Sequence, residues 1–274
     1  MTPRTTVMGV LMVAGLLAYL YYPAVTDLVT QWSLDVSNFG YGIFIPPVAA
    51  YLVWDRRREL RRAAGGGSWW GYPLVLAGVG MLILGRAGGV HILAWASLIV
   101  VLFGLALFLG GVRLTGLLAF PLLFLALMIP PPPALYLGLT WPLQMFTARF
   151  TTEVLRLVGY PVLLHGVYID LPKVRLEVAA ACSGFRSLVV LAATGVLLAF
   201  LAQSRPSARA ILIASVVPIG ILANSIRVAG NVILGIHDGT YHTIAGWVVF
   251  VMSTACLLTV SALLEGRGVR PAQP

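Results

Sequence analysis

Charged side chains and long hydrophilic stretches are scarce in this sequence. Only 10% of its 274 residues are charged, 59% are hydrophobic, and the mean hydropathy is +0.95. The hydrophobic share and the mean hydropathy lie far above those of a soluble domain, and the charged share lies far below. No polar stretch is long enough to bury a core of its own. The sequence therefore predicts one polytopic, all-α membrane domain over residues 1–274.

Cysteines and acidic residues are also few. The two cysteines, Cys182 and Cys256, do not suggest a disulfide framework. No acidic pair falls inside a predicted span, which disfavours an aspartyl intramembrane protease and a proton-coupled transporter. The sequence contains no metal-ligand spacing such as HExxH and no phosphate loop. We therefore expect neither a metal nor a cofactor.

Positive charge is present but dispersed. The net charge is +9, yet the basic residues lie between apolar stretches and form no separate basic domain. Positive loop charge in a membrane protein mostly sets orientation, so nucleic-acid binding is not expected. The strongest inside signal is DRRRELRR at residues 55–62. Placing this loop in the cytoplasm also puts both termini there and residues 130–181 outside, by alternation of spans.

Membrane spans are predicted wherever about 20 mostly apolar residues follow one another. The first stretch lacks a convincing small-x-small cleavage site before Pro23, so it is expected to remain as an uncleaved span. About eight spans are predicted in all. They cover residues 6–25, 39–54, 70–86, 90–110, 113–129, 185–202, 208–235 and 243–264.

The outer segment 130–181 is the one sizeable extramembrane element. It begins at Pro130–Pro133, which cannot continue a helix. Apolar residues then recur at helical spacing over 143–157, opposite a charged face. This pattern predicts an amphipathic helix at the outer membrane interface, with Trp141 as an anchor. A ninth span is the alternative, but it would place three charges in lipid.

Apolar and polar residues alternate on both sides of Pro172-Lys173. This alternation predicts a small β-hairpin that leads the chain to Cys182 at the outer surface.

Cys182 lies where this polar segment becomes an apolar helix. A helix N-terminus presents free N–H groups and a partial positive charge, which both stabilise a thiolate. Arg186 follows one turn later on the same face and favours the thiolate further, while Gly184 permits close approach of another backbone. The alternative is a buried structural cysteine. We expect that simpler role, packing, for Cys256, deep in the last span without charged neighbours.

Two later segments carry polar residues to the same membrane face. Asn224, Arg227 and Asn231 share one face of the predicted span 208–235. A charge within the outer leaflet is expensive and functional by default, although carbonyls or snorkelling can also satisfy an arginine. His242 stands at the start of the last span, and His237 in the preceding loop is its competitor.

Three motifs in this order resemble the exosortase/archaeosortase family of membrane cysteine transpeptidases. They are ACSGFRS at 181–187, NSIR at 224–227 and HTIAG at 242–246, and residues 37–57 are similar to the bacterial branch. The resemblance implies that Cys182 is a nucleophile that forms an acyl-thioester, that Arg227 is a proton donor or polarising cation, and that His242 is a base or transition-state stabiliser. The supporting or substrate-binding residues would be Ser183, Gly184, Arg186 and Asn224.

The resemblance also implies a substrate and a location. The substrates would be membrane-anchored secreted proteins with a C-terminal sorting signal of the Pro-Glu-Pro (PEP-CTERM-like) type. The acyl group would pass to a lipid or glycan acceptor, or to water, at the periplasmic face of a bacterial inner membrane. The alternative is a non-enzymatic membrane component of exopolysaccharide export or assembly, in which Arg227 and the outer basic residues hold an anionic glycan or lipid.

Overall fold

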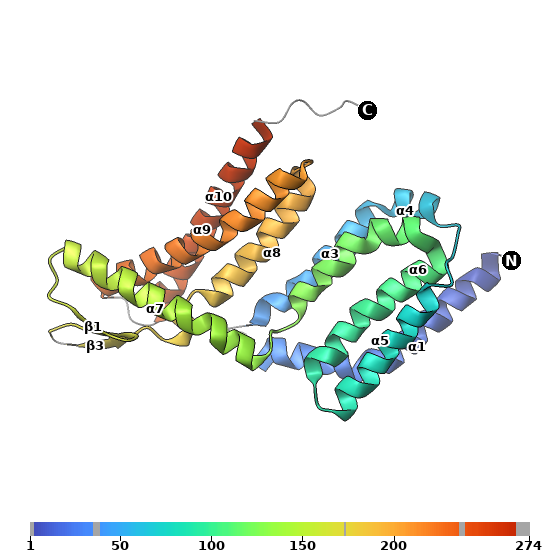
Figure 1. Cartoon of the computed structure of the whole chain (residues 1–274), viewed down its shortest axis with the longest axis horizontal. Coiled ribbons are helices and arrows are strands. Elements are labelled where there is room, and N and C mark those ends of the chain that lie inside the picture. The colour runs from blue at the N-terminus through green and yellow to red at the C-terminus, as the bar shows by residue number, and fades with distance from the viewer. Residues whose placement is uncertain (1–2, 35–38, 173, 236–238, 267–274) are drawn as a thin grey trace. The chain divides into compact units, whose positions relative to one another are not determined.

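The computed structural model describes residues 3–34, 39–172, 174–235 and 239–266 (Figure 1). Helices dominate this part of the chain, so the predicted all-α membrane fold is confirmed. The chain divides into two compact units, Met1–Pro132 and Pro133–Pro274. Each unit has its own set of packed helices, and all the predicted site residues fall in the second.

The first unit is built around one extensive helix pair, α5 and α6. Small residues let the two backbones approach closely, as in many membrane helix pairs. A Cβ atom added at Gly78 of α5 would lie 2.5 Å from the side chain of Val101 in α6. The elements of this unit are α1 (Pro3–Leu34), η1 (Gly40–Phe44), α3 (Ile45–Asp55), α4 (Arg57–Ala63), α5 (Gly71–Ala87), α6 (His91–Phe124) and η2 (Leu125–Met128).

Helix α6 contains a sharp break at Gly111. This residue has φ 75° and ψ −174°, a backbone conformation that only glycine adopts readily. The chain reverses direction there (Figure 1). The break falls between the predicted spans 90–110 and 113–129, so the 34 residues of α6 form two helical arms rather than one rod.

Five helical segments in the described residues are long and apolar enough to cross a membrane, as judged by length and composition. Among the other predicted spans, 39–54 corresponds to η1 with the 11-residue α3, and 70–86 to the 17-residue α5. The multi-pass character is therefore confirmed, and the count of about eight spans stays a prediction. The five segments are Leu11–Leu34, His91–Met128, Phe185–Ala202, Pro206–Ile233 and Thr243–Glu265.

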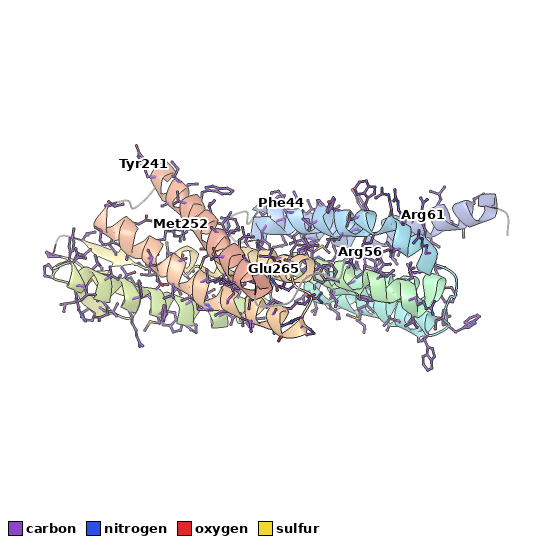
Figure 2. The ribbon with its side chains drawn as sticks, turned by 90° about the horizontal axis from the view of Figure 1, so that it is seen from above. Phe44, Arg56, Arg61, Tyr241, Met252 and Glu265 are labelled. Atoms are coloured by element: carbon purple, nitrogen blue, oxygen red, sulfur yellow. The ribbon has the colours of Figure 1, made fainter. Side chains whose placement is uncertain are left out.

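Large apolar side chains cover the outside of these helices. Tyr241 and Met252 of the last helix, for example, are 72% and 65% exposed (Figure 2). Exposed apolar surface of this extent is typical of helices that contact lipid.

In the second unit, three long helices pack together and share an apolar core. They are α8 (Phe185–Ala202), α9 (Pro206–Ile233) and α10 (Gly239–Gly266). Leu191, Leu212 and Leu257, one from each helix, are almost fully buried at the centre of this core. The core holds the ends of the three helices in a fixed relation, and those ends carry the predicted site residues.

Helix α7 (Pro133–Leu157) also packs on α9. The predicted helix over 143–157 is present and starts earlier, and its expected apolar and charged residues lie largely on the outside. The structure adds a third, buried face that the sequence interpretation missed. This face consists mainly of hydroxyl and amide residues: Thr140, Gln144, Thr147, Ala148, Thr151, Thr152 and Leu155.

A small antiparallel sheet follows α7. Its strands are β1 (Leu163–His165), β2 (Tyr168–Asp170) and β3 (Arg175–Glu177), in the order β1-β2-β3. The predicted hairpin corresponds to β2 and β3, whereas β1 was not predicted. A two-residue turn joins β1 to β2, and Gly166 occupies its first position with φ 64°, as such turns favour.

Candidate active site

Cys182 is the last residue of the short helix η3 (Ala180–Cys182), two residues before α8. Its side chain is half-buried and packs against the apolar cluster formed by α7 and the sheet. The backbone N–H of Cys182 donates to the Ala179 carbonyl at 2.8 Å. Its own carbonyl accepts a hydrogen bond from Nδ2 of Asn224 at 2.9 Å. The nucleophile candidate is thus fixed through its backbone to helix α9.

Gly184 makes the turn between η3 and α8 possible. It adopts the left-handed conformation, with φ 83° and ψ 2°. A Cβ atom at this position would also lie 2.5 Å from Cγ of Asn224. Any other residue would therefore meet both backbone strain and a steric conflict. The hydroxyl of the adjacent Ser183 accepts a hydrogen bond at 3.3 Å from the N–H of Phe185, the first residue of α8.

The start of α8 provides positive potential beside Cys182. The first turn of this 18-residue helix contains no acidic residue. Arg186 lies in that turn with an exposed side chain. Unpaired N–H groups at a helix N-terminus carry a partial positive charge, which favours a thiolate over a thiol.

Arg227 of α9 lies within electrostatic range of both Cys182 and Arg186. Its side chain is half-buried. A Cβ atom at Gly246 would lie 3.5 Å from Nη1 of Arg227, so the guanidinium lies against α10 at a position without a side chain. The Nε atom is buried and has no hydrogen-bond partner among the described residues. The structure therefore brings Cys182, Arg186 and Arg227 together.

His242 belongs to the first turn of α10, and its side chain is outside the described part of the structure. Gly246, which contacts Arg227, lies one turn further along the same helix face. His237, the competing histidine, also lies outside the described residues.

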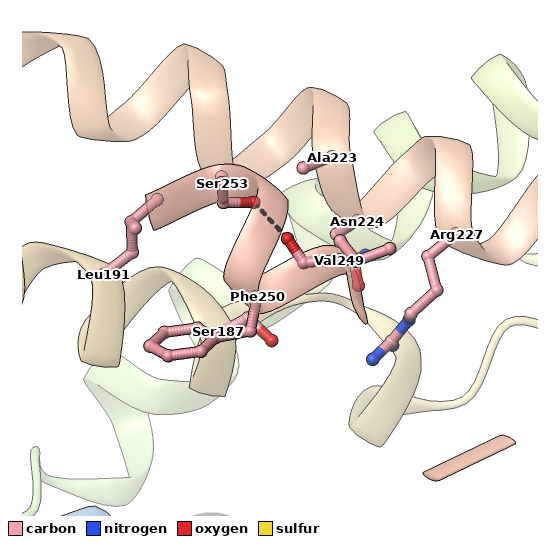
Figure 3. A pocket seen from close by; sticks show the side chains of 9 residues that line it. Ser187, Leu191, Ala223, Asn224, Arg227, Val249, Phe250 and Ser253 are labelled. Atoms are coloured by element: carbon pink, nitrogen blue, oxygen red, sulfur yellow. Dashed lines mark hydrogen bonds between the residues drawn. The ribbon is translucent and has the colours of Figure 1, made fainter. Parts of the chain in front are cut away.

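A small cavity of about 10 Å³ lies between α8, α9 and α10 beneath these residues (Figure 3). Its polar lining comes from Ser187, Asn224, Arg227 and Ser253. Oδ1 of Asn224 is buried and lacks a hydrogen-bond partner among the described residues, as does Nε of Arg227. The space corresponds to about one water molecule.

A second polar layer supports the site. Gln144 of α7 donates from Nε2 to the Val178 carbonyl at 2.9 Å, and the hydroxyls of Thr147 and Ser225 are 3.5 Å apart. Val178 precedes η3, and Ser225 is next to Asn224 in α9. These residues were missed in the sequence, although Thr140, Gln144, Thr147 and Thr151 recur there at helical spacing.

Cys256 differs from its prediction. Neither cysteine takes part in a disulfide, but the Cys256 side chain is exposed on the outside of α10. The prediction that it packs in the interior is wrong, because depth along a helix does not tell which face a residue occupies. Among the described residues, no group of three or more His, Cys, Asp or Glu side chains could hold a metal ion.

The family model for the transmembrane exosortases matches residues 32–259. The chain belongs to this family. The matched region contains Cys182, Arg227 and His242, so the resemblance based on the three motifs is confirmed at the level of the family. No curated protein and no solved structure matches the chain.

Proposed function

We propose that this transmembrane exosortase is a cysteine transpeptidase that acts at the outer face of a bacterial inner membrane. The observation that supports this most strongly is the geometry around Cys182. Only Ser183 and Gly184 separate the residue from the N-terminus of α8, Asn224 holds its backbone, and Arg227 lies within electrostatic range of it. This environment favours a thiolate, the reactive form of cysteine.

In the proposed reaction, the Cys182 sulfur attacks a backbone carbonyl of the substrate. The peptide C–N bond breaks, the departing amine takes up a proton, and the acyl group stays on sulfur as a thioester. An amine or hydroxyl of a lipid or glycan acceptor, or water, then attacks the thioester carbonyl and releases the thiolate.

Arg227 would stabilise the charge that develops on the carbonyl oxygen in each step. A planar guanidinium with several donors suits this role in a site with little water. His242, one turn before the contact between α10 and Arg227, would supply the proton to the departing amine and remove it from the acceptor.

Asn224, Gly184 and Ser183 would act as positioning residues. Asn224 fixes the Cys182 carbonyl, Gly184 allows that contact, and Ser183 accepts a hydrogen bond from the first N–H of α8. A rigid backbone at the nucleophile limits the orientations that its sulfur can take, which favours attack on a bound carbonyl.

The proposed substrates are secreted proteins that carry a PEP-CTERM-like sorting signal at the C-terminus, followed by a membrane helix. That helix would hold the scissile bond at the outer interface of a bacterial inner membrane. Binding in the bilayer would then supply most of the positioning that the reaction needs.

The test is processing of a tagged sorting-signal substrate in membranes that contain the full chain. Cys182→Ala should abolish processing while insertion and expression remain. Cys256→Ser is the matched control, because this thiol is exposed and distant in sequence from the site. The intact enzyme should also form a substrate adduct on Cys182 that hydroxylamine releases, as expected for a thioester. Full processing by Cys182→Ala would contradict the proposal and favour the non-enzymatic role in polysaccharide export.

A further inference from the structure

The outer edge of strand β3 carries backbone groups with nothing to pair with in the described part of the chain. Strand order β1-β2-β3 leaves β3 with a strand neighbour on one side only. The chain runs directly from this strand through Val178 and η3 to Cys182. An exposed strand edge is a ready template for another extended segment.

The hydrogen-bond pattern tells which groups point to this edge. Leu171 and Val174 exchange both of their backbone hydrogen bonds, at 2.9 and 3.3 Å, and the Val178 N–H donates to the Val167 carbonyl at 2.9 Å. In an antiparallel pair, alternate residues point toward the partner strand. The backbone N–H and C=O groups of Val174, Leu176 and Val178 therefore point toward β2. Those of the residues between them point toward the outer edge of the sheet.

The outward residues are Arg175 and Glu177. Both backbone groups of Arg175 and the N–H of Glu177 make no hydrogen bond with described residues, and the Glu177 carbonyl accepts from the Ala179 N–H at 3.0 Å. Equivalent groups on residues two apart in a strand recur about every 6.6 Å. An extended peptide is the ligand whose donors and acceptors repeat at that spacing.

The side chains of Arg175 and Leu176 in β3 make contacts within the sheet and with α7. Arg175 forms an ion pair with Asp170 at 2.9 Å, and its guanidinium carbon lies 5.0 Å from the centroid of the Tyr168 ring. Leu176 packs on the opposite face with the fully buried Ile169, against α7. These two contacts hold the strand in place, and its outward backbone groups remain open to a ligand.

We propose that β3 binds the extended segment of the substrate that precedes its membrane helix, as an added parallel strand. This inference rests on the proposed function. The substrate order would be extended segment, scissile bond and membrane helix, and the order here is β3, Cys182 and α8. Parallel pairing therefore brings the scissile carbonyl to Cys182 while the two membrane helices run in the same direction.

The spacing sets the length of the recognised segment. Cys182 lies five positions after Glu177, which corresponds to at most about 17 Å of extended chain. The paired residues of the substrate should therefore lie at most about five residues before the scissile bond. Substrate residues in this stretch would be selected for their ability to adopt an extended backbone.

The first test removes the outward N–H of Glu177. Glu177→Pro lacks this donor, whereas Glu177→Ala keeps it and separates the contribution of the side chain. We expect kcat/KM for a tagged substrate to be about five- to ten-fold lower in Glu177→Pro than in Glu177→Ala, mainly through KM, as for the loss of one backbone hydrogen bond. Leu164→Pro is the control, because by the same alternation its N–H points to the opposite edge, that of β1.

Integrity of the site is measured separately in a Cys256→Ser background, where Cys182 is the remaining thiol. Labelling of Cys182 by iodoacetamide should proceed at the same rate in Glu177→Pro and Glu177→Ala. Equal kcat/KM in these two variants would overturn the proposal. So would a lower labelling rate in Glu177→Pro alone, because the loss would then arise from a disturbed site.

The second test changes the substrate. Synthetic substrates N-methylated at single positions before the scissile bond should lose about five- to ten-fold in kcat/KM at the position whose N–H pairs with the Arg175 carbonyl, and less than about two-fold at the two neighbouring positions. Equal losses at neighbouring positions, or no loss at any position, would overturn strand pairing. If strand pairing is overturned in this way while a thioester still forms on Cys182, the proposed function stands. Processing by Cys182→Ala would overturn both the proposed function and the strand-pairing inference.

Discussion

The helix pairs α5–α6 and α7–α9 bury opposite kinds of surface. In α5–α6, Gly78 packs directly against Val101, and the contact is small and apolar. In α7–α9, Thr147 meets Ser225, and Thr151 of the same buried face has a fully buried hydroxyl without a partner among the described residues. Helices in lipid gain little hydrophobic energy from association, so close packing of small residues is the ordinary solution. The polar pair stands out for this reason.

We infer from this difference that the α5–α6 pair serves as a structural framework, whereas the α7–α9 pair supports the candidate site. Unsatisfied hydroxyls in a membrane protein cost stability and are retained mainly where function needs them. The polar pair adjoins Asn224 and Arg227, whereas the apolar pair belongs to the unit that contains no predicted catalytic residue. Changes beside Asn224 and Arg227 should therefore alter activity, and changes in the α5–α6 pair should alter stability.

The largest effect is expected for Arg227→Lys. Lysine keeps the charge but loses the planar fork and the contact with α10 near Gly246. We expect kcat for substrate processing to fall about 10²- to 10³-fold, the range found when an oxyanion donor is removed. The thermal stability of the protein in detergent should change little, because the charge is kept. Near-normal turnover would show that Arg227 has a structural role only.

Two glycine substitutions should distinguish the role of the first unit from that of the second. Gly184→Ala introduces strain at φ 83° and a conflict with Asn224, so we expect a loss of at least about ten-fold in kcat/KM, equivalent to about 1.4 kcal/mol. Gly78→Ala crowds Val101 in the first unit and should instead lower stability by about 1–3 kcal/mol. The measurements are substrate processing and thermal unfolding in detergent for each variant.

The distinction between the two helix pairs would be contradicted if both glycine variants changed kcat/KM and thermal stability in the same way. A loss of activity per folded molecule in Gly78→Ala would contradict the assignment of the α5–α6 pair to the scaffold. A normal kcat/KM in Gly184→Ala would show that the turn before α8 tolerates displacement.

The smallest effect is expected for Thr151→Val. The change replaces a buried, unpartnered hydroxyl with a methyl group of similar size. It should be neutral or stabilising by up to about 1 kcal/mol in thermal unfolding. Gln144→Leu is the contrasting variant, because it leaves the Val178 carbonyl without its donor and should destabilise the protein by about 1–3 kcal/mol. A destabilising Thr151→Val would indicate a water bound to the hydroxyl.

Much of the fold and the family was predictable from residue order. Apolar stretches of sufficient length predicted the membrane helices, and alternation around Pro172 predicted the β2–β3 hairpin. Local signals also identified Cys182 at the start of a helix and Arg227 within one. Strand β1 was missed because its three residues, Leu163–His165, are too few for a clear alternation.

Other features escaped prediction because they depend on contacts between distant segments. The buried face of α7 is polar, and a periodicity search for apolar residues points to its opposite, outward face. Cys256 was expected inside, but its orientation depends on how α10 packs against α8 and α9. Neither property is encoded within one helix.

The sequence alone determined that this is a polytopic membrane protein and which residues carry the motifs of the exosortase family, because composition and order are local properties. The tertiary structure decided how those residues meet. Residues 182, 184 and 224 come together because Asn224 donates to the Cys182 carbonyl across 42 positions of the chain, and because Gly184 leaves the space for it. Such a contact forms only when α8 and α9 are packed, since neither helix can satisfy the Cys182 carbonyl alone.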